Sequence, residues 1–97
     1  DAKNLHVLPG VIDSQVHFRD PGLEHKEEIA HGTRSAIKGG VTSIFEMPNT
    51  SPLTLDEDTL SQKLEIARRT AWCDFAFFMG GNSENAHQLA ELERLPG

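Results

Sequence analysis

The chain has 97 residues, of which 15 are acidic and 9 are Lys or Arg, so its formal net charge is −6. This acidic balance disfavours the phosphate backbone of a nucleic acid, and we expect no nucleic-acid partner. No apolar run approaches the ~20 residues that a membrane-spanning helix needs, so we expect no membrane partner. The single cysteine, Cys73, cannot form an internal disulfide, which favours a reduced, cytoplasmic setting.

Three strand-like apolar segments recur along the chain: Leu5–Ile12, Val41–Met47 and Cys73–Met79. Their starts lie roughly 32–36 residues apart, which is about the length of a βα repeat. Their mostly continuous apolar character is typical of strands that are buried on both faces of a parallel sheet.

Helix-like patterns fill the intervals between these segments. The first covers Lys26–Lys38. The second begins near Thr54, whose T-x-x-E spacing to Glu57 fits a capping box, and the third begins near Ser83. With right-handed crossovers, the order β-α-β-α-β-α predicts that all three strands are parallel.

Two architectures fit this order: an open doubly wound sheet and part of a (β/α)₈ barrel. No dinucleotide-binding or Walker glycine pattern follows any strand. Each strand instead ends in polar or turn-forming residues, at 13–20, 48–50 and 80–82, and barrel enzymes collect their chemistry at that rim. We therefore predict an α/β fold, a partial (β/α)₈ TIM barrel made of the first three βα units. Residues 1–97 are expected to be the N-terminal fragment of a single barrel domain.

The segment IDSQVHFRD, residues 12–20, places several reactive side chains after the first strand. His17 is the strongest candidate metal ligand, because neutral imidazole is a common zinc ligand. A histidine hydrogen-bonded within the rim is the alternative. Gln15 would lie on the same face of an extended strand, but its neutral amide is a poor zinc ligand. It could bind a water or the substrate, or be a polar rim residue.

Two further side chains suit an anionic ligand. Arg19 offers a rigid fork of donors that matches a carboxylate, and its alternative is an ion pair with Asp20 or Glu24. Asn49 follows Pro48 in the second strand's loop, and its amide could donate to the same anion. The alternative for Asn49 is ordinary turn chemistry.

These residues resemble a known family. The stretches LPGVIDSQVHFRDPGLEHKEEI and GGVTSIFEMPNTSPLT resemble the opening of a dihydroorotase of the amidohydrolase superfamily. The motifs V-H-F-R-x-P-G, G-G-V-T and M-P-N-T are specific in combination, and the resemblance continues more loosely beyond Leu55. Allantoinases and hydantoinases share the first-strand pattern.

The resemblance implies a (β/α)₈ barrel with one or two zinc ions. It implies an enzyme, a hydrolase that interconverts L-dihydroorotate and N-carbamoyl-L-aspartate in pyrimidine biosynthesis. His17 matches the second His of the family's H-x-H zinc motif, and Arg19 and Asn49 match the residues that hold the substrate's carboxylate. Zinc would polarise the ring carbonyl and lower the pKa of the attacking water.

The sequence departs from the family pattern in two respects. Gln15 stands where the family usually has its first zinc-binding His, so a single zinc ion or an altered metal affinity is an open alternative. The chain also stops before the family's remaining ligands, which are a carboxylated Lys or Asp, two His and an Asp. We therefore expect no catalytic residue within it, zinc absent or weakly bound, and no activity of the chain alone.

Two other functions stay open. One is a non-catalytic dihydroorotase homologue with a scaffold role, and the other is an allantoinase or dihydropyrimidinase. Apart from the small-molecule substrate, the expected partner is a second copy of the protein in a homo-oligomer. Three parallel strands also leave two open edges, which is an association hazard.

Overall fold

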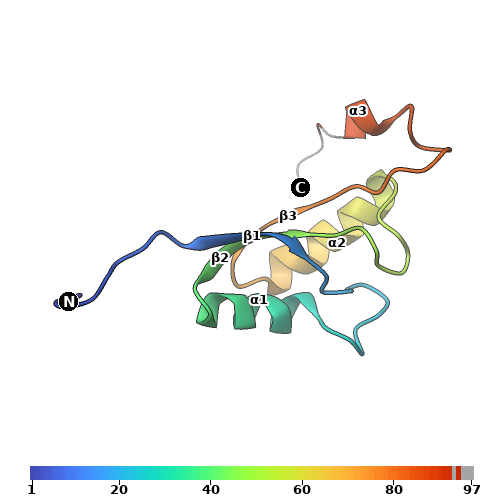
Figure 1. The fold of residues 1–97 in the computed structure, drawn as a ribbon. Coiled ribbons are helices and arrows are strands. Elements are labelled where there is room, and N and C mark those ends of the chain that lie inside the picture. The colour runs from blue at the N-terminus through green and yellow to red at the C-terminus, as the bar shows by residue number, and fades with distance from the viewer. Residues whose placement is uncertain (93, 95–97) are drawn as a thin grey trace.

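The computed structural model describes residues 1–92 and 94. Strands and helices alternate along the chain (Figure 1), in the order β1 (Val11–Val16), α1 (Ile29–Lys38), β2 (Val41–Glu46), α2 (Glu57–Thr70), β3 (Asp74–Phe77) and α3 (Leu89–Leu92). The strands form one parallel sheet in the order β1-β2-β3. The predicted element order and parallel strands are therefore confirmed. Residues 93 and 95–97 of the expected domain lie outside the described residues.

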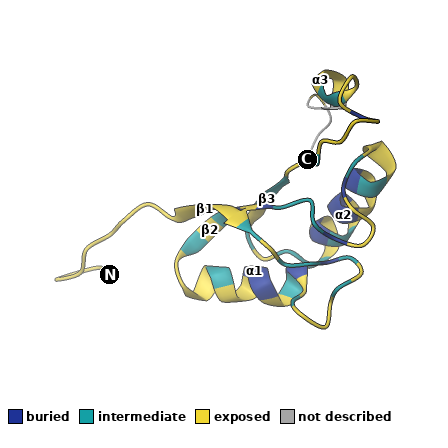
Figure 2. Ribbon diagram, turned by 45° about the vertical axis from the view of Figure 1, so that its right-hand side comes forward, coloured by how far each residue is buried: buried dark blue, intermediate teal, exposed yellow. Residues whose placement is uncertain are grey.

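One layer of helices covers one face of the sheet. Helix α1 packs against β2 and α2, and both long helices lie on the same side of the strands (Figure 1). Their inward faces are the most buried parts of the molecule (Figure 2). The buried apolar side chains are those of Ile29, Ile44, Leu60, Leu64 and Ala67. Among the described residues, no helix is both long enough and apolar enough to cross a membrane.

The opposite face of the sheet is open. Phe45 of β2 is 37% exposed, and its ring meets that of Phe78 edge-on with 5.9 Å between centroids. Strand β1 is exposed over most of its length. Burial of the strands on both faces, as their composition predicts, is therefore wrong for this chain, because helices cover only one face.

The first strand lies further along the chain than the apolar run Leu5–Ile12 predicts. It begins at Val11, whose N–H donates to the carbonyl of Gly40 at 3.0 Å, and it continues through polar residues to Val16. Leu8 is 80% exposed, and Pro9 has no N–H for a strand ladder. Pairing with β2, and not hydrophobicity, therefore sets the bounds of this edge strand.

Helix α2 begins at Glu57, and its N-cap lies two residues after the predicted cap at Thr54. Its N-cap is Asp56, whose carboxylate accepts from the N–H of Thr59 at 2.8 Å. The Thr59 hydroxyl accepts from the N–H of Asp56 at 3.2 Å, which completes a capping box. Thr54 is fully buried and bonds to Thr50 instead. The motif type was predicted, but its position was wrong.

The first and third helices are shorter than expected. The first starts at Ile29 and not at Lys26, because Glu28 is extended and the Ile29 N–H donates to Asp20 Oδ2 at 3.1 Å. Before Leu89, the carboxamide of Asn82 accepts from two backbone N–H groups at 2.8 Å. Such side-chain bonds compete with helix formation, so residues 84–88 form turns.

The capping box of α2 gives the first prediction. Asp56→Ala should lower the free energy of unfolding at pH 7 by about 0.5–2 kcal/mol, because it leaves helix N–H groups without an acceptor. The hydrogen bonds from Thr59 hold the pKa of the Asp56 carboxyl below its ordinary value of 3.8. The stabilisation is thus fully present above that ordinary value and is lost as the pH falls through the lowered pKa. Urea titrations at several pH values would measure both effects.

The matched control is Glu57→Ala, which removes the acidic half of the capping box that the sequence pattern predicts. It should cost less than Asp56→Ala, because Glu57 supplies only a charge near the helix N-terminus. A larger loss for Glu57→Ala, or an acid dependence that persists in Asp56→Ala, would contradict the assignment.

Candidate functional site

The candidate site lies at the carboxyl ends of β1 and β2. His17 follows β1 directly, and Asn49 lies in the turn after β2. The two strands pair in parallel, with Val16 opposite Glu46, so both loops leave the sheet at the same edge. His17 Nδ1 lies 3.0 Å from Asn49 Oδ1, although the residues are 32 positions apart in the sequence. The structure thus brings together two of the side chains that the sequence singled out.

This hydrogen bond indicates which ring nitrogen of His17 carries the proton. An amide oxygen only accepts, so the proton of the contact belongs to His17 Nδ1. In the neutral ring, Nε2 then keeps its lone pair, and the His17 side chain is exposed. Fixing one ring nitrogen through a neighbouring acceptor is how proteins orient a metal-binding histidine. His17 therefore fits the role of one metal ligand through Nε2.

Arg19 is the third predicted side chain at this edge. Its backbone is in the left-handed region, with φ of 68°, and its side chain is half-buried. Neither acidic neighbour forms the ion pair that the alternative reading requires. The Asp20 carboxylate accepts from the Ile29 N–H, and the Glu24 carboxylate accepts from the Gly22 N–H at 2.6 Å. Because β1 ends at Val16, Arg19 belongs to the loop and not to a continued strand face.

The two loops contact each other directly. The N–H of Ser51 donates to the carbonyl of Pro21 at 3.0 Å. Gly22 has φ of 92°, and a Cβ added there would lie 1.9 Å from the Ser51 carbonyl oxygen. Only glycine permits so close an approach. The loop that carries Arg19 therefore packs directly against the loop that carries Asn49.

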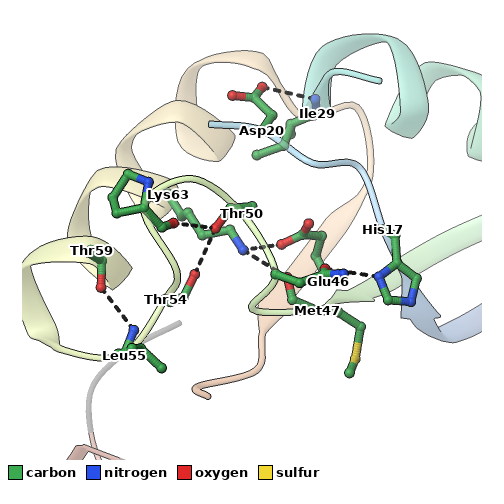
Figure 3. Close-up of polar contacts among 12 residues, drawn as sticks. His17, Asp20, Ile29, Glu46, Met47, Thr50, Thr54, Leu55, Thr59 and Lys63 are labelled. Carbon is green, nitrogen blue, oxygen red and sulfur yellow. Dashed lines mark hydrogen bonds and ion pairs between the residues drawn. The ribbon is translucent and has the colours of Figure 1, made fainter. Parts of the chain in front are cut away.

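Hydrogen bonds within the turn after β2 stabilise it. Thr50 is buried, and its hydroxyl donates to the Pro52 carbonyl at 2.8 Å. It also lies 3.3 Å from the hydroxyl of Thr54 (Figure 3). The Thr54 N–H donates to the Pro48 carbonyl at 3.0 Å. Asn49 is thus carried by a turn with several fixed points.

Beneath this turn lies a buried ion pair that the sequence reasoning missed. Lys63 of α2 reaches the carboxylate of Glu46 at the end of β2, and both side chains are at most 1% exposed (Figure 3). Burial raises the pKa of the Glu46 carboxyl and lowers that of the Lys63 ammonium, while each charge opposes the shift of its partner. The available signal was a lysine among Leu60, Leu64 and Ala67 on the inner face of a helix.

Gln15, the doubtful metal ligand of the sequence, is exposed. It lies on β1, and its backbone N–H donates to Asp13 Oδ1 at 3.1 Å. Within residues 1–92 and 94, no three His, Cys, Asp or Glu side chains gather closely enough to hold a metal ion. A site made of three such ligands would therefore need residues from outside the described part of the chain.

Comparison with known proteins identifies relatives of this chain. The sequence model of the dihydro-orotase-like family matches residues 5–94. The multifunctional protein CAD of Squalus acanthias is 48% identical over 82 residues, which cover 84% of this chain and 4% of that protein. The dihydroorotase of Methanosarcina mazei is 43% identical over 95 residues, which cover 98% of this chain and 21% of that enzyme.

A solved structure extends the similarity to the fold. The L-hydantoinase (dihydropyrimidinase) of Arthrobacter aurescens superposes with a TM-score of 0.77 at 34% identity, over 88% of this chain and 19% of the hydantoinase chain. The chain thus spans about a fifth or less of these relatives. Its three parallel βα units correspond to part of the hydantoinase barrel, which confirms the predicted partial (β/α)₈ barrel. By sequence and by fold, the chain belongs to the dihydroorotase-like family of the amidohydrolase superfamily.

Proposed function

We propose that this chain supplies part of the active site of a metal-dependent cyclic amidohydrolase of the dihydroorotase type. The complete protein would interconvert L-dihydroorotate and N-carbamoyl-L-aspartate, and residues 1–97 would be the first three units of its single barrel domain. One observation carries the proposal: the contact between His17 Nδ1 and Asn49 Oδ1 at the edge where Arg19 also lies. Family membership supports the reaction type.

His17 would hold the metal through Nε2, which the Asn49 contact leaves with its lone pair. A zinc ion bound there would supply a polarised substrate carbonyl and a water of lowered pKa. Gln15 offers only a neutral amide at the neighbouring position, which argues for one zinc ion or for weaker binding of a second. Further ligands would come from other parts of the complete protein.

Arg19 and Asn49 would bind the carboxylate of the substrate. The guanidinium presents two parallel donors, and the Asn49 amide keeps its Nδ2 hydrogens for an anion while Oδ1 accepts from His17. Asn49 would therefore touch the metal ligand and the substrate at once. The loop contact between Pro21 and Ser51 supports a common binding edge for the two side chains.

A hydantoinase-type activity is the second candidate, because a hydantoinase matches the fold at 34% identity. Its ring substrates lack the carboxylate that Arg19 suits. A scaffold role without catalysis is the third, and it gains support if the complete protein, folded and supplied with zinc, opens none of these rings.

The first test of the proposed function measures ring opening by the complete protein. We expect turnover of L-dihydroorotate that a chelator abolishes and zinc restores, with weaker turnover of hydantoin and dihydrouracil. Preference for an uncharged ring would favour the hydantoinase candidate. A folded, zinc-supplied protein that opens none of these rings would leave the scaffold role.

The second test concerns the metal ligand. His17→Ala should lower the zinc content of the complete protein and cut turnover of L-dihydroorotate at least about 100-fold, because ligands and their orienting partners each govern metal affinity strongly. His87→Ala, at an exposed position in a turn, is the matched control and should keep both. Metal analysis after gel filtration would read out the content. Undiminished zinc in His17→Ala would remove His17 from the site.

The third test separates substrate binding from catalysis. Arg19→Ala should lower kcat/KM for L-dihydroorotate about 10- to 100-fold, mainly through KM, because it removes hydrogen bonds to a charged group. The same substitution should change kcat/KM for an uncharged cyclic amide far less. Equal losses on both substrates would show that Arg19 acts on the protein and not on the carboxylate.

A further inference from the structure

The Glu46–Lys63 ion pair has no part in the site as described so far. Both side chains lie between the sheet and helix α2, away from the open face of the sheet. Neither could reach a substrate at the exposed edge. Yet a carboxylate and an ammonium occupy two of the most buried positions in the chain.

Stability does not explain this pair. Removing two charges from water is costly, and replacing a buried pair by apolar side chains of similar volume is often neutral or stabilising. Leu60, Leu64 and Ala67 already make this helix face apolar, so an apolar side chain would suit position 63. The pair therefore has to be explained by what its atoms hold in place.

Lys63 holds the end of β2. Its Nζ donates to the carbonyl of Met47 at 3.1 Å, two residues before Asn49 (Figure 3). The same ammonium lies 5.0 Å from the ring centroid of Phe77, the residue of β3 opposite Glu46. One side chain thus links α2 to the ends of two strands.

Glu46 faces the other loop. The Met47 N–H donates to the Val16 carbonyl at 2.9 Å, so the chain that follows β1 passes close to Glu46. The Glu46 carboxylate pairs with Lys63, and so it holds the ammonium group that donates to the Met47 carbonyl.

We propose that Glu46 and Lys63 are positioning residues that hold the loops carrying His17, Arg19 and Asn49 at a fixed distance from each other. Lys63 fixes the start of the Asn49 turn, and the Glu46 carboxylate holds the Lys63 ammonium in place. The Met47 N–H in turn donates to the Val16 carbonyl, directly before His17. The inference rests on the proposed function for its kinetic consequence, but its structural consequence is independent of it. A shift of about 1 Å in such a constellation can cost about 100-fold in rate.

The decisive variant is E46L/K63M, which replaces the pair by apolar side chains. Its unfolding midpoint in urea should match that of the wild type, while kcat/KM for L-dihydroorotate falls about 10- to 100-fold, because the loops that carry His17, Arg19 and Asn49 are no longer held in place. E65Q/R69Q removes the exposed pair one turn further along α2 and should change neither quantity. Wild-type kcat/KM in a stable E46L/K63M protein would overturn the proposal.

A readout that needs no turnover is the tautomer of His17 in the metal-depleted complete protein, labelled with ¹⁵N-histidine. The wild type should show the Nδ1–H form, and E46L/K63M should show a mixture as the Asn49 contact loosens. If the wild type fails to open L-dihydroorotate, the proposed function is wrong. The His17 tautomer would still show whether Glu46 and Lys63 hold the loops in place. An unchanged tautomer in the variant would refute the positioning role.

Two further variants cover the case in which E46L/K63M does not fold and test its coupling to Arg19. If E46L/K63M does not fold, E46Q keeps the shape and the acceptor of residue 46 but removes its charge, and a wild-type KM and tautomer in E46Q would count against the proposal. In the Arg19→Ala background, E46L/K63M should raise KM less than in the wild type, because both changes act through the same carboxylate site. If the effects of Arg19→Ala and E46L/K63M on KM are additive, the ion pair does not act through the carboxylate site.

Discussion

Parallel pairing of β1 with β2 is the constraint on which the site depends. Val11 lies opposite Val41 and Val16 opposite Glu46, so both strands end at the same edge of the sheet. Residues that follow the two strands are thereby brought close together, as His17 and Asn49 are at 3.0 Å. The crossover through α1 makes this parallel pairing possible, and Ile29 and Ile44 are buried.

The Asn49 amide is the point at which the proposed metal and substrate functions would meet. Its oxygen accepts from His17, and its nitrogen hydrogens would bind the substrate's carboxylate. Any displacement of the Asn49 turn would therefore alter both the imidazole's orientation and the anion site. This explains why the turn has several fixed points, through Thr50, Thr54 and the contact of Ser51 with Pro21.

Much of the fold could be predicted because the apolar segments, the helix-like patterns between them and the repeat length all indicate the same βα order. His17 and Asn49 could be brought together because the ends of parallel strands share an edge. The bounds of β1 could not be predicted, because hydrogen bonding to β2 includes polar residues such as Asp13 and excludes the exposed run before Val11. The cap at Asp56 was missed because Thr54 fits the same pattern and only tertiary burial distinguishes the two.

The roles of Glu46 and Lys63 lay beyond sequence reasoning for a different reason. A lysine among apolar side chains on the inner face of α2 is a signal by itself, but only the packing of α2 on β2 shows that Glu46 is its partner. Alternation along β2 places Ile44 and Glu46 toward the helices and Phe45 toward the open face. In a barrel the open face of the sheet becomes the interior, and the reactive residues lie at the carboxyl ends of the strands. The layer between strands and helices can then only influence the positions of those residues. An ion pair buried in that outer layer touches no ligand, and apolar side chains of similar volume would serve stability as well. Positional control of the rim is the role we propose for it.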